Sequence, residues 1–132
     1  MRPGIQKDSL PEDPWLSPSL EEIFLAESIQ TQLRKGVLEL CVLTLLSRGD
    51  AYGYEIASKL MTDVGMGEGT IYPLMRRMQE DGMVSTYLME TSGGPPRKYY
   101  RLTAAGRTTL KAQRGEWKNF QAAVEKMLGD DA

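Results

Sequence analysis

Two short basic segments contain the residues that could bind a polyanion. Arg76 and Arg77 are adjacent, and Arg97, Lys98 and Arg101 lie about 20 residues further along the chain. A guanidinium group can pair with phosphate or with the edge of guanine through two parallel hydrogen bonds, whereas an ammonium group acts as a point charge. The chain has 16 basic and 18 acidic residues, a net charge of -2. Attraction for nucleic acid must therefore come from these two segments, because the chain as a whole supplies none.

The sequence lacks the residues that most catalytic and metal-binding sites require. The chain has no histidine, and Cys41 is its one cysteine. A zinc site made of cysteines and histidines, a Ser-His-Asp triad and an internal disulfide are therefore excluded. The acidic residues, lysines and tyrosines form no convergent pattern, so we expect no enzyme activity, no cofactor and no metal. Cys41 lies in an apolar run without a neighbouring cation, which favours a packing role over a reactive thiol.

A helix must position the first basic segment, because apolar residues recur through it at i, i+3, i+4 and i+7. These residues are Ile71, Leu74, Met75 and Met78. Proline is tolerated in a first helical turn, so Pro73 predicts that the helix begins near Gly69 or Thr70. The opposite face then carries Thr70, Pro73, Arg76, Arg77 and Glu80, with Tyr72 at its flank.

The elements around this helix predict a mainly α fold with a small β-hairpin, a winged helix-turn-helix. Another amphipathic helix covers residues 52–61, and a Gly-rich turn at residues 62–67 joins it to the basic helix. Residues 83–91 have the β-branched and aromatic content of a strand. Residues 92–96 read as a turn, and residues 97–102 as the returning strand.

The second basic segment lies on the returning strand. Alternation places Arg97, Tyr99 and Arg101 on one face of this strand and Lys98 and Tyr100 on the other. We expect Arg97 and Lys98 to contact the backbone or minor groove of a nucleic acid. The tyrosines are expected to pack or brace the fold, and they are Tyr52, Tyr54, Tyr99 and Tyr100.

A C-terminal helix opens at Thr103 and carries two series of residues repeating at seven. One series is Leu110, Trp117 and Val124, and the other is Gln113, Phe120 and Met127. Such a repeat is typical of a helix that pairs with another helix, so this seam predicts dimerisation.

The remaining sequence sets the domain boundaries. Residues 37–46 are apolar on nearly every side, which is typical of a helix packed between others. Residues 1–32 contain a Pro-rich, acidic arm followed by a short helix. We therefore divide the chain into this extension, a DNA-binding domain at residues 33–102 and a dimerisation helix at residues 103–132. No apolar run approaches the ~18 residues of a membrane helix, so we expect no membrane span and a cytoplasmic location.

Four motifs follow one another between residues 33 and 128. They are Tyr52-Gly53-Tyr54-Glu55-Ile56, residues 68–74 with Arg76 and Arg77, Glu80-Asp81-Gly82, and residues 94–103 with Gly106. Together they resemble the PadR family of bacterial transcriptional regulators, in its short form with a single C-terminal helix. The resemblance implies a homodimeric winged-helix repressor whose C-terminal helix packs against the first core helix of the partner.

The resemblance also implies an operator of double-stranded DNA, read by a recognition helix in the major groove. The DNA-binding residues it implies are Thr70, Tyr72, Pro73, Arg76, Arg77, Arg97 and Lys98. The residues implied at the dimer interface or at a site for a small planar effector are Leu110, Trp117, Phe120, Val124 and Met127. Family members usually have Ser or Thr where this chain has Gly67, which leaves the start of the recognition helix open.

Four questions stay open at this point. Tyr72 either touches DNA or fills the gap between helix and wing, and the roles of the two adjacent arginines cannot be told apart. Trp117 is either dimer core or the wall of an effector cavity. The alternative function is a winged-helix protein-interaction module without specific DNA binding, which the acidic pI of about 5.2 would suit.

Overall fold

The computed structural model describes residues 19–21 and 37–129. Residues 37–47 are helical, as the apolar run predicts, and this helix contributes much of the core. Its buried side chains are Leu38, Val42, Leu43 and Leu46. Of the extension predicted for residues 1–32, Leu20 and Glu21 are helical, and the rest lies outside the described residues.

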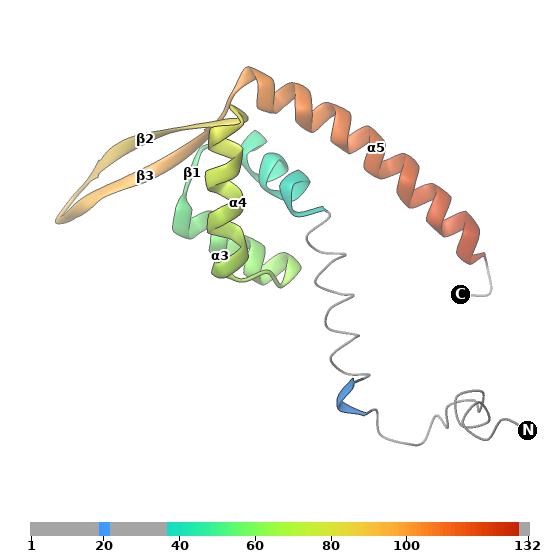
Figure 1. The fold of residues 1–132 in the computed structure, drawn as a ribbon. Helices are drawn as coiled ribbons and strands as arrows, with labels where there is room; N and C mark the ends of the chain where they lie inside the picture. Colours follow the sequence, from blue (N-terminus) through green and yellow to red (C-terminus); the bar gives the residue numbers. More distant parts are fainter. Residues whose placement is uncertain (1–18, 22–36, 130–132) are drawn as a thin grey trace, which may run out of the picture. The chain divides into compact units, whose positions relative to one another are not determined.

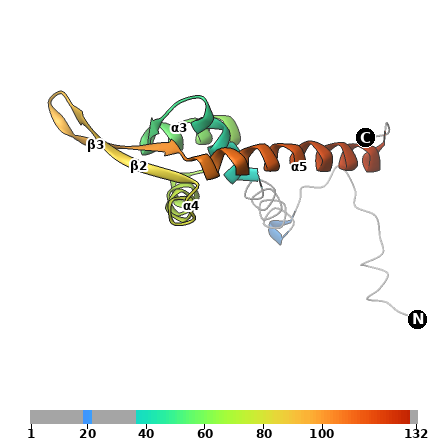
Figure 2. The ribbon, with the colours of Figure 1, turned by 90° about the horizontal axis from the view of Figure 1, so that it is seen from above.

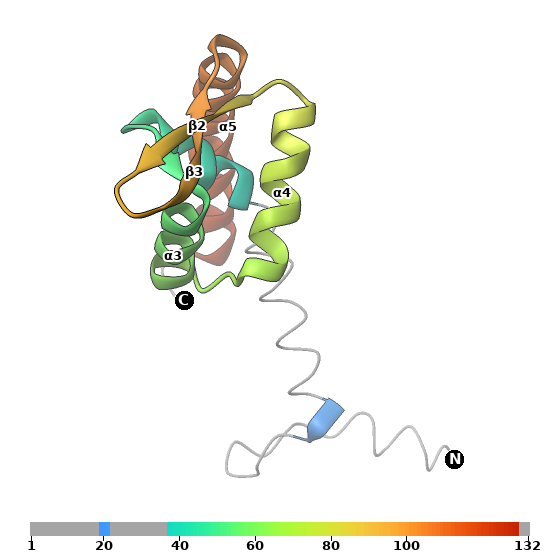
Figure 3. The ribbon, with the colours of Figure 1, turned by 90° about the vertical axis from the view of Figure 1, so that its left-hand side faces the viewer.

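Two further helices pack against this helix and against each other (Figure 3). Helix α3 (Gly53–Val64) buries Ile56, Ala57 and Leu60. Helix α4 (Glu68–Glu80) buries Ile71, Leu74, Met75 and Met78, the face that the spacing predicts. Gly65 ends α3 at φ 70°, a left-handed conformation that glycine adopts without a Cβ clash. The two helices and their short connection form the helix-turn-helix.

A three-stranded antiparallel sheet in the order β1-β3-β2 completes the wing. Strand β1 (Ala51–Tyr52) pairs with β3 (Gly94–Leu102), which pairs along its length with β2 (Val84–Thr91). Val84, Tyr100 and Leu102 turn one face of the sheet into the core. The β2–β3 hairpin and the long helix α5 (Ala104–Leu128) project in opposite directions from the packed helices (Figures 1 and 2).

The start of α5 is fixed to the turn that follows α4. The Thr103 hydroxyl caps α5 by accepting the Gly106 N–H at 3.0 Å, and it lies 2.7 Å from the Gly82 carbonyl oxygen, to which it donates. The Thr103 N–H donates to the Met83 carbonyl at 3.1 Å. A Cβ on Gly106 would overlap that same carbonyl oxygen, so the approach of α5 to this turn requires glycine.

The structure corrects two predicted boundaries of the helix-turn-helix. Helix α3 runs to Val64, so the first half of the segment predicted as a turn, residues 62–64, is helical. Helix α4 begins at Glu68, one residue before the predicted start near Gly69 or Thr70, which places Pro73 in the second turn and not in the first. Pro73 has no N–H for the Gly69 carbonyl, but Gly69 is exposed and water can solvate that oxygen.

The sheet differs from the prediction at both ends. Strand β1 was not predicted, because two residues are too short to show alternation. Strand β3 begins at Gly94, so Pro95 and Pro96 lie inside it. The ladder is irregular between Met89 and Thr91, opposite these prolines, which have no N–H to donate.

The described residues from 37 onward belong to one structural unit, and residues 1–33 belong to another. Within the described ranges, none of the helices combines the length and the apolar character needed to cross a bilayer.

Candidate nucleic-acid interface

Arg76 lies on the outward face of α4, opposite the buried residues of that helix. Its side chain is exposed, and within the described residues it forms no ion pair. Burial raises the pKa of Tyr100 and Tyr72 adds to the rise, whereas the positive charge of Arg76 opposes it. Arg76 is therefore on the solvent side of α4, and within the described residues its guanidinium has no carboxylate partner.

Arg77 follows Arg76 by one position and points about 100° away around the helix. Its Nη2 lies 3.6 Å from Oε2 of Glu39, in the helix at residues 37–47. The other carboxylate oxygen of Glu39 accepts a hydrogen bond from Nε2 of Gln113 in α5, at 2.9 Å. Glu39 thus joins α4 and α5, and the two adjacent arginines have different surroundings.

Tyr72 is half-buried between α3 and the wing. A Cβ on Gly53 would lie 3.3 Å from Cε1 of Tyr72 and 3.7 Å from Cε1 of Tyr100, so both rings crowd the start of α3. Burial raises the pKa of Tyr72, and the charge of Glu68 adds to the effect. The ring of Tyr72 packs in this gap, at the flank of the outward face.

The two faces of the wing alternate as the sequence predicts. Lys98 and Tyr100 share the face that meets the helices, with the Lys98 Nζ 5.6 Å from the Tyr100 ring centroid. Leu88 lies opposite Lys98 in the ladder and is 71% exposed. The Lys98 ammonium is therefore on the same side of the sheet as α4.

The other face of the wing carries three tyrosine rings and two guanidinium groups, which we call the outer ladder. Its members are Tyr52, Tyr87, Tyr99, Arg97 and Arg101. Tyr99 lies 5.6 Å, centroid to centroid, from each of the other two rings, Arg97 lies 4.5 Å from the centroid of the Tyr52 ring, and Arg101 lies 4.8 Å from that of Tyr87. These cation–π contacts hold both guanidinium groups against the protein.

Asp50 binds two members of the outer ladder, Tyr87 and Arg101. Its Oδ2 accepts a hydrogen bond from the Tyr87 hydroxyl at 2.7 Å and another from Nε of Arg101 at 3.2 Å. The hydrogen bond to Asp50 is the largest cause of the raised pKa of Tyr87. The ladder braces the wing against the segment before α3, as expected of the tyrosines.

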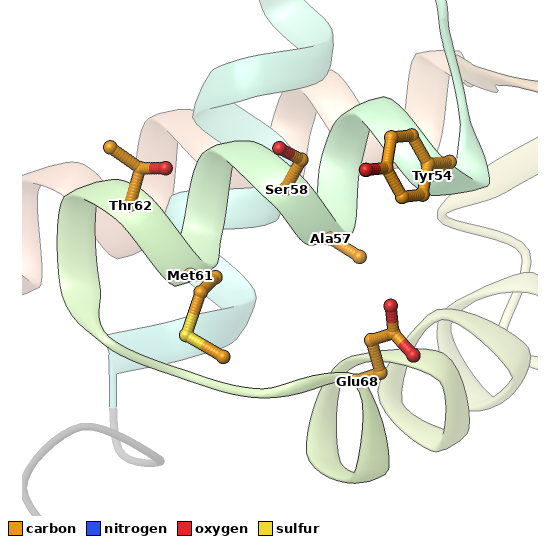
Figure 4. Close-up of a pocket in the computed structure, with 6 residues that line it drawn as sticks. All are labelled: Tyr54, Ala57, Ser58, Met61, Thr62 and Glu68. Atoms are coloured by element: carbon orange, nitrogen blue, oxygen red, sulfur yellow. The ribbon is translucent and has the colours of Figure 1, made fainter.

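An open groove of about 400 Å³ lies beside the start of α4 (Figure 4). The α3 side carries the hydroxyls of Tyr54, Ser58 and Thr62, spaced four residues apart, and Glu68 of α4 faces them. Tyr54 was expected to pack or brace the fold; it is 62% exposed, and its ring stacks on that of Tyr52 with the centroids 6.5 Å apart. Gly67 is the N-cap of α4 and has no side chain that could cap the helix. The start of α4 therefore lacks the hydroxyl that a Ser or Thr at this position would supply.

The predicted seam of α5 is exposed in the single chain, apart from its first member. Leu110 is buried in the core, whereas Trp117 and Val124 are each 38% exposed. Phe120 and Met127 are 64% and 87% exposed. Cys41 packs against the core and burial raises the pKa of its thiol, in keeping with the packing role predicted for it.

The structure thus gives the predicted basic residues different surroundings. Within the described residues, Arg76 has neither an ion pair nor a cation–π contact, and Thr70 and Pro73 lie on the same helix. Arg77 lies beside Glu39, whereas Arg97 and Lys98 each lie over a tyrosine ring. Sequence reasoning missed Glu39, which joins the two helices. The available signal was a lone carboxylate within the apolar run at residues 37–46.

Comparison with known proteins points to one family. A family model described as the transcriptional regulator PadR-like family matches residues 42–112. A PadR-like transcriptional regulator from Bacillus cereus, of solved structure, is 38% identical, and the match covers 74% of this chain and 97% of that one with a TM-score of 0.68. A PadR family regulator from Eggerthella lenta is 32% identical, with 85% and 99% covered and a TM-score of 0.74. A third, from Clostridium difficile, is 30% identical, with 70% and 99% covered and a TM-score of 0.65.

Proposed function

Because this chain belongs to the PadR-like family of transcriptional regulators, we propose that it is a repressor that binds an inverted-repeat operator as a homodimer. The family implies regulation through DNA binding and no enzyme activity. The observation that carries the proposal is the exposed Arg76 on the outward face of α4, whose guanidinium has no ion-pair partner within the described part of the chain. A helix-turn-helix places this face in the major groove.

Each proposed contact follows from the position of its residue. Arg76 pairs with guanine or with phosphate, and Lys98 contacts the backbone beside the wing as a point charge. Thr70 and Pro73 lie on the same helix and approach the groove, and Tyr72 fixes the wing beside them. Arg77 contributes less because it has a carboxylate partner. Arg97 also contributes less, because it lies 4.5 Å from the Tyr52 ring centroid, closer than the 5.6 Å between Lys98 and the Tyr100 ring.

The exposed part of the α5 seam supports the homodimer. Trp117, Phe120, Val124 and Met127 place apolar side chains in solvent along one helix, and burial against a second copy removes them from water. Trp117 either packs in that interface or lines a cavity for a small planar effector that releases the operator. The repressor acts in the cytoplasm, where its DNA is.

Footprinting of a genomic fragment that the purified protein retains tests this function. We expect protection of two half-sites about one helical turn apart, because a two-fold dimer presents two recognition helices. Protection of one isolated half-site by a monomer contradicts the dimeric reading. Binding that is absent, or independent of salt, favours the protein-interaction module instead.

A further inference from the structure

We propose that Glu39 is a positioning residue that withholds Arg77 from DNA, and that Gln113 of α5 holds the Glu39 carboxylate in place. The inference rests on the proposed DNA binding. It adds that Glu39 limits how many positive charges of α4 can pair with DNA phosphates. It starts from one carboxylate whose two oxygens contact two different helices.

The two carboxylate oxygens of Glu39 have different partners. Oε1 of Glu39 accepts the Gln113 amide at 2.9 Å, a distance typical of a well-formed hydrogen bond. Oε2 is left for the Arg77 guanidinium at 3.6 Å. The Glu39 side chain is 23% exposed and that of Arg77 is 61% exposed. The carboxylate is therefore the fixed member of the pair, and the arginine is the one that water, or DNA, can reach.

The contrast with Arg76 shows what the contact does. Both arginines are on the basic segment of α4, but within the described residues only Arg77 has a carboxylate partner. A phosphate brought close by DNA must displace this carboxylate to pair with the same guanidinium, and the Gln113 hydrogen bond keeps the carboxylate in place. The charge of Glu39 therefore sets how often Arg77 pairs with a DNA phosphate and how often it stays paired with the carboxylate.

Gln113 connects this contact to the predicted dimer helix. Gln113 lies one turn before Trp117 on α5. A movement of α5, caused by its partner helix or by a ligand at Trp117, would carry the Gln113 amide away from Glu39. The carboxylate would then turn toward solvent and hold Arg77 less firmly.

Salt dependence of DNA binding measures whether Arg77 is withheld, because the slope of log affinity against log salt reports the number of phosphates neutralised. Glu39→Gln keeps an oxygen for Gln113 and removes the charge that holds Arg77. We expect a slope steeper by about 0.9, equivalent to an extra ~3-fold loss of affinity between 50 and 200 mM salt. Adding Arg77→Ala to this variant should restore the wild-type slope.

Two controls separate this effect from general charge and from folding. Glu116→Gln makes the same charge change at an exposed position of α5 and should leave the slope at the wild-type value. Arg77→Ala alone should change the wild-type slope little. Gln113→Ala should give a slope between those of the wild type and Glu39→Gln, and a wild-type slope in that variant would overturn the anchoring assigned to α5.

The inference is overturned if Glu39→Gln keeps the wild-type slope, if Glu116→Gln steepens it equally, or if Arg77→Ala flattens it in the wild-type background. These outcomes leave DNA binding itself intact. A wild-type protein that binds no DNA in a salt-dependent way would overturn the proposed function and this inference together.

Discussion

At the scale of single residues, Arg76 and Lys98 make different predictions because their chemistry differs. Arg76→Ala should weaken operator binding by about 1 to 3 kcal/mol if the lost contact is to a base. Lys98→Ala should weaken binding to all sequences alike and reduce the salt slope by about 0.9. Fluorescence anisotropy with operator and scrambled duplexes, over a series of salt concentrations, distinguishes the two effects.

Arg114→Ala is the matched control for both substitutions. It removes one positive charge from an exposed position of α5, away from α4 and the wing. An equal loss of affinity in this variant, or full affinity in Arg76→Ala, would contradict the assignment of the contact to α4.

Tyr100 makes a prediction about alkaline stability. Burial raises the pKa of Tyr100 above its usual value near 10. A raised pKa in the folded state favours the neutral phenol, so its contribution to stability is complete below pH 10 and is lost as pH rises through the folded pKa. Denaturant unfolding of wild type and Tyr100→Phe at pH 8 to 11 should show a smaller fall for the variant. Parallel curves would show that Tyr100 titrates alike in both states.

At the scale of elements, the junction between α4 and α5 has the least room for a larger side chain. Gly106→Ala places a methyl group on the Met83 carbonyl, so part of the junction must move, at a cost of about 1 to 3 kcal/mol or more. Gly115→Ala is the control in the same helix, because nothing lies within 4 Å of its added Cβ. There we expect stabilisation of about 0.5 to 1 kcal/mol. Urea denaturation measures both, and equal effects would refute the close approach.

The elements themselves were largely predictable, and their ends were less so. The buried face of α4, the strand alternation at Arg97 to Arg101 and the family were all evident, because periodicity and motif order are local properties of the sequence. Helix ends and the strand β1 depend on tertiary contacts that no short window contains. The outer ladder and the Glu39 contacts join residues far apart in the chain. The sequence therefore predicted which basic residues form the candidate site, but not which of them have partners within the protein.

At the scale of the whole molecule, Trp117 distinguishes an interface from a sensor. If Trp117 is dimer core, Trp117→Ala should cost about 3 to 5 kcal/mol and yield monomers that bind the operator poorly. If it lines a cavity, the variant should stay dimeric, bind the operator and lose its response to planar compounds. We expect the first outcome. Size-exclusion mass and quenching of indole fluorescence by a flat dye measure the two possibilities.

Lys118→Ala is the control for this experiment, since Lys118 is the exposed neighbour of Trp117. A variant dimer together with saturable quenching in the wild type would contradict dimer core and establish the sensor. Monomers from Lys118→Ala as well would show that the helix, and not the indole, is sensitive to substitution.

The direct passage from β3 through Thr103 into α5 makes the wing and the dimer helix one continuous stretch of chain. In the proposed dimer, the rotational phase of α5 sets the angle at which each copy presents α4. One residue inserted between Leu110 and Trp117 would rotate the rest of the seam by about 100°. Such an insertion would change which operator spacing fits the proposed dimer while leaving every residue of the proposed DNA interface unaltered, so a helix outside that interface would set the operator geometry.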